Sequence, residues 1–154
     1  MAVVRHEKTR GELKRMAQTQ PPETLVRLSD SKLTVANRAE DIRGREVLDK
    51  NGGNLGKVDD LMIDDVEHKV RFPQVESGGF LGLGETRILI PVDAITKIDD
   101  KVHINHTREH VARAPRYNPE LVKDEAYLGS IYGHYGYPVF WEPGYAYPMY
   151  PFYL

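Results

Sequence analysis

Three histidines stand close together in the chain, and histidine is the side chain most often used to bind metals or move protons near neutral pH. They are His103, His106 and His110. On one continuous helix, spacings of three and four residues would place them on one face, as a zinc site requires. The pattern of Lys101–Asn105 instead predicts a strand, with His103 on it and His110 in a following turn. We therefore favour ordinary surface histidines over a metal site.

Acidic residues form the second group with a possible chemical role. Asp59-Asp60 and Asp64-Asp65, together with Glu67, cross one predicted strand and its turn. Calcium needs six or more oxygens that converge on one point, and the spacing of an EF-hand loop is missing. We interpret these residues as solvated hairpin acids.

No motif for catalysis accompanies these groups. The sequence contains no HExxH, GxSxG or P-loop pattern. It has no cysteine, which excludes thiol catalysis and cysteine-bound metals. We expect a protein that is not an enzyme and that carries no cofactor.

The glycine-rich stretch Gly78–Gly84 resembles a phosphate-binding loop only superficially. Its glycines run in the wrong order for a dinucleotide fingerprint, and the β-type segment Arg87–Val92 follows it. A phosphate site of that kind needs a helix N-terminus behind the glycines. The glycines are better explained as a tight corner. The three apolar residues between them either plug a barrel end or form an exposed docking knob: Phe80, Leu81 and Leu83.

From Asp41 onward, short strands with turn signals position these groups. Asn51-Gly52-Gly53 predicts a tight hairpin, because both residue types accept positive φ. Pro73 predicts a sheet edge or a bulge, since proline cannot donate to a ladder. Thr107 is a typical N-cap for a short helical turn. The residues expected in the core of these strands are Val58, Leu61, Ile63, Val102 and Ile104.

This pattern indicates an all-β fold, a small closed or half-open barrel of five to six short antiparallel strands with flanking extensions. Five segments in order resemble a PRC-barrel domain: Gly44–Asp49, Gly56–Leu61, Gly78–Gly84, Ile90–Val92 and Ala114–Tyr117. The resemblance covers roughly residues 41–119 and is closest to short stand-alone bacterial versions. The family is named after the H subunit of the photosynthetic reaction centre, and the same fold forms the C-terminal half of the ribosome maturation factor RimM.

The resemblance implies a docking module without a family active site. The reaction-centre subunit has a transmembrane helix before its barrel, and RimM has a whole domain there. Neither feature is found in this sequence, so neither protein's role is transferred. We expect a protein-interaction and assembly module whose partners are proteins.

Three zones follow from composition. Residues 1–22 form a basic, flexible arm, and residues 23–119 form the barrel domain, which starts with a short strand or docking segment at Glu23–Ser29. Residues 120–154 form a tail rich in tyrosine, glycine and proline, which is either an adhesive arm or a disordered low-complexity tail. Its interaction candidates are Tyr132, Tyr135, Tyr137, Phe140 and Trp141.

Charge and hydropathy limit the classes of partner that this protein can have. A net charge of −2 makes nucleic acid an unfavoured partner, and no apolar run has the length of a membrane span. The absence of cysteine and of a signal peptide leads us to expect a cytoplasmic protein. We also expect a homo-oligomer. Two alternatives remain, an RNA- or ribosome-associated accessory factor by analogy with RimM, and a barrel that binds a small ligand or metal.

Overall fold

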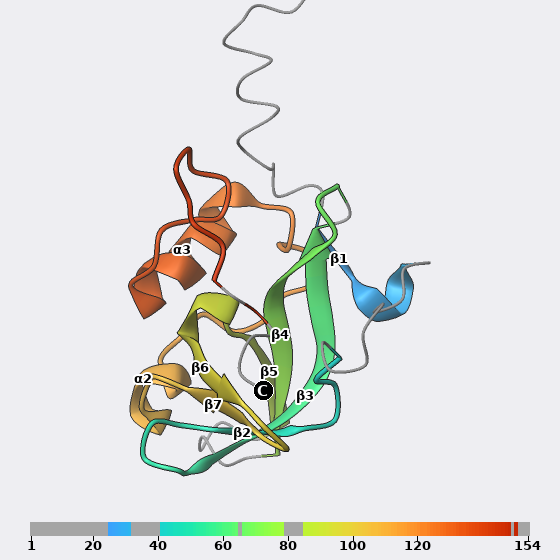
Figure 1. Ribbon diagram of the computed structural model, residues 1–154. Helices are drawn as coiled ribbons and strands as arrows, with labels where there is room; N and C mark the ends of the chain where they lie inside the picture. The colour runs from blue at the N-terminus through green and yellow to red at the C-terminus, as the bar shows by residue number, and fades with distance from the viewer. Residues whose placement is uncertain (1–24, 32–40, 65, 79–84, 149, 151–154) are drawn as a thin grey trace, which may run out of the picture.

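The computed structural model describes residues 25–31, 41–64, 66–78, 85–148 and 150 (Figure 1). This part of the chain forms seven strands, two α-helices and two short 3-10 helices. The strands are β1 (Leu25–Arg27), β2 (Glu46–Leu48), β3 (Asn54–Asp64), β4 (Lys69–Gly78), β5 (Glu85–Leu89), β6 (Ile95–Ile98) and β7 (Val102–Ile104). The helices are η2 (Leu28–Asp30), η4 (Val92–Ala94), α2 (Arg108–Ala112) and α3 (Glu125–Tyr135).

All seven strands belong to one mixed sheet. Its order is β5-β4-β3-β2-β7-β6, and β1 pairs with β3 beside this path. The long strand β3 pairs with β2 in its first half and with β1 in its second half. Strands β2 and β7 run parallel, whereas every other pair is antiparallel.

The β-rich architecture is confirmed, but the predicted strand number and the all-antiparallel pairing are wrong. There are seven strands and one pair is parallel. No β5–β6 pairing closes the sheet among the strands that the structure describes, which favours the half-open form over the closed one. Two α-helices also join the strands. Parallel pairing needs a long connection. The connection between β2 and β7 contains four other strands. No local turn signal in the sequence therefore predicts that β2 and β7 pair.

The hairpin turn between β2 and β3 forms as predicted. Gly52 has φ +87°, and the Asp49 carboxylate accepts hydrogen bonds from the backbone N–H groups of Asn51 and Gly53. The same carboxylate accepts the backbone N–H of Arg108, 2.9 Å away, at the start of α2. This turn therefore also fixes where α2 begins.

The N-cap prediction is confirmed as well. The Thr107 hydroxyl accepts the backbone N–H of His110 at 3.1 Å and caps α2. The side chains predicted for the strand core are all buried: Val58, Leu61, Ile63, Val102 and Ile104.

Pro73 lies in an internal strand, so the edge alternative is wrong. β4 has β3 on one side and β5 on the other. Two register irregularities between β3 and β4 flank the proline, and one of them leaves Arg71 without a partner in the ladder. A bulge of this kind redirects the side chain at the extra position. The bulge at Arg71 has the larger consequence for the fold.

At Gly56 the backbone of β3 approaches that of β4 closely. Its φ is +131°, and an added Cβ would lie 2.1 Å from the carbonyl oxygen of Glu76. Because that neighbour is backbone, it cannot swing aside. β3 can lie this close to Glu76 of β4 only with glycine at position 56.

We therefore expect Gly56→Ala to lower the free energy of unfolding by about 3 kcal/mol, from φ strain and overpacking together. Gly44→Ala is the matched control, because Gly44 has φ +89° with no atom near the added Cβ. It should cost about 1 kcal/mol from φ strain alone. Urea denaturation of both variants measures the difference. Equal losses of unfolding free energy would contradict the argument that the two backbones approach too closely for a Cβ at Gly56.

Candidate interaction site

The aromatic C-terminal segment folds back onto the sheet. It begins with α3, whose N-cap Asp124 accepts the Tyr127 N–H and whose C-terminus ends at Gly136 with φ +86°. Residues 136–148, here called the strap, continue from that glycine. Leu128 and Ile131 of α3 are fully buried in the main core. α3 therefore packs as part of the core.

The structure buries much of the predicted interaction set within its own chain. Tyr132, Tyr135 and Phe140 are buried, and the Tyr132 ring lies 5.1 Å from that of Phe72. Tyr137 and Trp141 are half-buried and keep some area for a partner. The remaining candidates lie outside the described residues: Phe80, Leu81 and Leu83.

Arg71, directed out of the ladder by its bulge, is the centre of the strap contact. Its guanidinium carbon lies 4.3 Å from the ring centre of Phe140, 5.4 Å from Tyr147 and 6.0 Å from Tyr145. We call these three rings the Arg71 cage. The guanidinium also pairs with Glu67 at 2.7 Å and with the fully buried Asp64 at 3.4 Å. Two carboxylates near the turn between β3 and β4 thus balance the positive charge of Arg71, and three ring faces of the strap stabilise it further.

Two tyrosine hydroxyls complete the docking of the strap. Tyr147 donates to the backbone carbonyl of Val70, and Tyr145 donates to Asp93, each at 2.9 Å. Burial raises the pKa of the Asp93 carboxyl, although the hydrogen bond from Tyr145 acts against that rise. Burial also raises the pKa of Tyr145. The hydrogen bond between Tyr145 and Asp93 connects η4 to the strap.

The clustered histidines form a stack between α2 and α3. The ring centres of His106 and His110 lie 5.2 Å apart, and those of His110 and His134 lie 4.1 Å apart. His110 and His134 each donate Nε2–H to the other residue's backbone carbonyl, and His106 contacts the Tyr137 hydroxyl at 2.9 Å. His103 lies apart and contacts Asp99 at 3.1 Å. His134 was missed because it is distant in sequence.

Stacked imidazoles do not point their nitrogens at a common centre. Within the described chain, no group of three or more histidine or acidic side chains is arranged to hold a metal ion. Burial lowers the pKa of His106, and the neighbouring histidines and Lys50 act in the same direction. The stack therefore joins α2 to α3 through ring contacts and hydrogen bonds.

The acidic residues are dispersed among separate partners. Asp59 accepts from Gln74 and Arg87, and Asp60 accepts from Ser29. Asp64 serves Arg71, as described above, while Asp65 lies outside the described residues. The prediction of a solvated hairpin patch is wrong for Asp60 and Asp64, which are buried.

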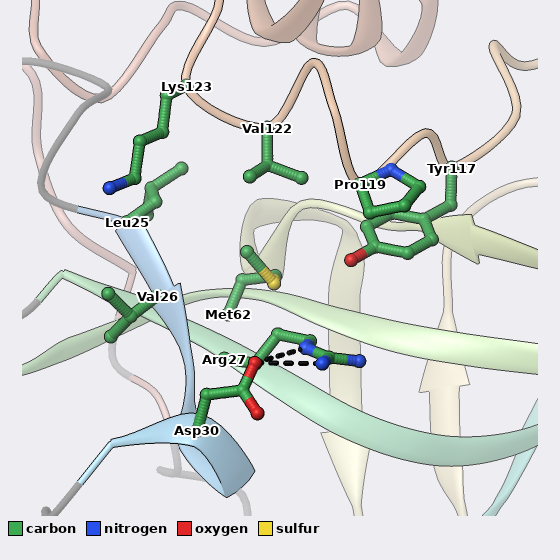
Figure 2. A pocket seen from close by; sticks show the side chains of 9 residues that line it. All are labelled: Leu25, Val26, Arg27, Asp30, Met62, Tyr117, Pro119, Val122 and Lys123. Carbon is green, nitrogen blue, oxygen red and sulfur yellow. Dashed lines mark hydrogen bonds and ion pairs between the residues drawn. The ribbon is translucent and has the colours of Figure 1, made fainter.

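A groove of about 390 Å³ opens beside β1 (Figure 2). We call it the β1 groove. Residues of β1, η2 and β3 form one side, and the connection between α2 and α3 forms the other. Its lining consists of Leu25, Val26, Arg27, Asp30, Met62, Tyr117, Pro119, Val122 and Lys123. This volume lies in the lower part of the range for ligand sites.

The groove has an apolar floor and charged ends. Leu25 and Met62 are each 1% exposed. Figure 2 shows Lys123 above Leu25 at one end and the Arg27–Asp30 pair at the other. Arg27 contacts Asp30 at 2.8 Å, and that hydrogen bond raises the pKa of Arg27. Burial raises the pKa of the Tyr117 hydroxyl on the opposite wall.

The sequence predicted the strand that forms one wall, but it predicted neither the groove nor its second wall. Glu23–Ser29 was predicted as a short strand or docking segment, and β1 lies within it. Residues 120–123 were assigned to the tail, so their approach to β1 was not foreseen. No local signal in those residues indicates it, since the approach depends on where α3 packs.

Comparison with known proteins places most of the groove outside a recognised domain. The model of the PRC-barrel domain family matches residues 35–111, which is half of the chain. No curated protein matches it. Among the groove residues, only Met62 falls within the matched range. In the described chain, no helix is long and apolar enough to cross a membrane.

We expect Arg71→Ala to lower the free energy of unfolding by about 3 kcal/mol, because it leaves Asp64 buried without its cation and empties the cage. The fluorescence of Trp141, the sole tryptophan, should shift to the red as the strap loosens. Arg87→Ala is the matched control, since its ion pairs are exposed and should cost less than about 1 kcal/mol. A loss at Arg71 no larger than at Arg87 would refute the central role of the cage.

We also expect the stability to fall as the pH drops below about 6.5, the ordinary value for histidine. The unfolded chain binds a proton at His106 before the folded chain does, because folding lowers this pKa. His106→Gln should flatten the curve of unfolding free energy against pH between that value and the lowered pKa. His68→Asn, at an exposed turn, should leave the curve unchanged. Urea denaturation across the pH range measures both, and a steep curve in His106→Gln would count against the stack.

Proposed function

The chain belongs to the PRC-barrel family, and from this membership together with the open edge at β1 we propose that it is a non-enzymatic module that binds other proteins. The observation that carries the proposal is the pairing of β1. Among the described strands, β1 is paired with β3 alone, and the β1 groove runs along it. The unpaired edge of a strand offers backbone N–H and C=O groups to a second chain.

The commitments of the polar side chains support a non-enzymatic role. Ser31 and Ser130 donate to nearby backbone carbonyls, and Ser29 donates to Asp60. Hydrolytic catalysis by serine would need a base beside the hydroxyl and a third group that orients the base. The one carboxylate beside Ser29, that of Asp60, also accepts the backbone N–H groups of Ser29 and Leu61, which commits it to local structure. The hydrogen bonds of these three serines stabilise turns and helix ends.

Self-association is the finer part of the proposal, and the strap is the element that would achieve it. α3 and the strap contact their own sheet through the Arg71 cage and through buried side chains such as Ile131. If the connection at 117–124 opened, the same contacts would form on a second copy. Such an exchange of identical elements is a low-cost route to a dimer.

The β1 groove also supports a second candidate function, the binding of a small ligand. Its volume of about 390 Å³ and its apolar floor suit a small amphipathic molecule. We place this second, because the groove extends along a strand edge.

One experiment tests both parts of the proposal. The chain is produced in its source cells as two copies with different affinity tags, captured through one tag, and analysed by quantitative mass spectrometry. We expect recovery of the second copy and of at least one other protein in near-stoichiometric amount. Lysates mixed only after cell breakage control for association during purification. Recovery of neither the second copy nor another protein would refute the module.

A further inference from the structure

The β1 groove reaches the free edge of the strand as well as its face. Leu25 and Arg27 point to one face, because side chains alternate along a strand, and Met62 shares this face as the partner of Arg27. Val26 belongs to the opposite face and still lines the groove. The groove must therefore border the backbone of β1. A ligand in it lies beside unpaired main-chain groups.

The electrostatics of the groove are unbalanced toward positive charge. Its lining carries two cations, Arg27 and Lys123, and one carboxylate, Asp30. Arg27 and Asp30 neutralise each other. Lys123 is exposed and has no ion pair with any residue that the structure describes. The adjacent Asp124 caps α3 and is not among the residues that line the groove. The charge left for a ligand is therefore one ammonium, at the Leu25 end.

We propose that the β1 groove binds an extended segment of a partner protein, which adds to β1 as a further strand and carries an acidic residue opposite Lys123. An apolar side chain of this segment fills the space over Met62, between Val122 and Pro119. The inference rests on the proposed function and specifies the chemistry of the partner.

Other occupants match these observations less well. A small carboxylate would use Lys123 and the apolar floor but would leave the main-chain groups of β1 unpaired. The chain's own basic arm, residues 1–22, would bring arginine and lysine toward an ammonium group. An acidic and apolar strand uses the floor, the edge and the cation together.

The test is a selection of short random peptides, displayed on phage, against the intact chain. We expect the enriched peptides to alternate apolar residues and to carry aspartate or glutamate. Their affinity, measured by fluorescence anisotropy, should fall about tenfold with Lys123→Glu, which corresponds to about 1.4 kcal/mol. Lys123→Gln, which removes the charge without reversing it, should give a smaller loss. Hydrogen exchange of the backbone amides at residues 25–27 should slow when the peptide binds.

Lys97→Glu is the charge-matched control, since Lys97 is exposed on β6 and has only a surface pair with Asp99. It should leave peptide affinity unchanged within about twofold. Four results would overturn the proposal: no enrichment, enriched peptides that are basic, affinities insensitive to both Lys123 variants, or unaltered exchange at β1. Binding of decanoate, a small amphipathic carboxylate, in the absence of any enriched peptide would assign the groove to a small ligand. The capture experiment can recover a protein partner even if the peptide experiments give one of the four overturning results. In that case the proposed interaction module stands and only the assignment of this groove falls.

Discussion

The burial of Arg71 is the constraint on which the rest of the structure depends. A guanidinium removed from water is strongly unfavourable unless anions and other favourable partners surround it. Asp64 and Glu67 supply the anions from the adjacent turn, and the Arg71 cage supplies three ring faces from the far end of the chain. The strap can leave the sheet only by exposing this cation together with the core side chains beneath it. This couples the C-terminal segment to the sheet.

That coupling also builds the groove. When the strap and α3 are held on the sheet, the connection from α2 must cross beside β1 to reach Asp124, the N-cap of α3. Pro119, Val122 and Lys123 become the second wall for this reason. The histidine stack fixes the other end of the same unit, by joining α2 to the end of α3. The groove is therefore a product of intramolecular packing, and its shape depends on contacts that lie elsewhere.

What could be predicted from the sequence follows the range of the interactions. The Asn51–Gly53 turn, the Thr107 cap and the alternation of Val102 and Ile104 depend on neighbours in sequence, and these predictions are confirmed. The parallel pairing of β2 with β7 and the burial of Tyr132 depend on partners far along the chain. Composition shows many aromatics in the tail but does not say whose surface they cover. The groove itself was not predicted: the sequence indicated only the strand that forms one wall, because the other wall is positioned by a distant contact.

The position of the family match suggests how such a module acquires its specificity. The matched range, residues 35–111, contains strands β2 to β7, most of the core side chains and the close approach at Gly56. Eight of the nine groove residues come from the segments before and after it. A sheet buried on its core face has little freedom to change, since each side chain packs against several others. Flanking segments that line a surface can vary with less loss of stability. If the β1 groove binds a partner as proposed, partner choice is encoded in β1 and in residues 117–123, while the barrel sequence maintains the platform that holds them.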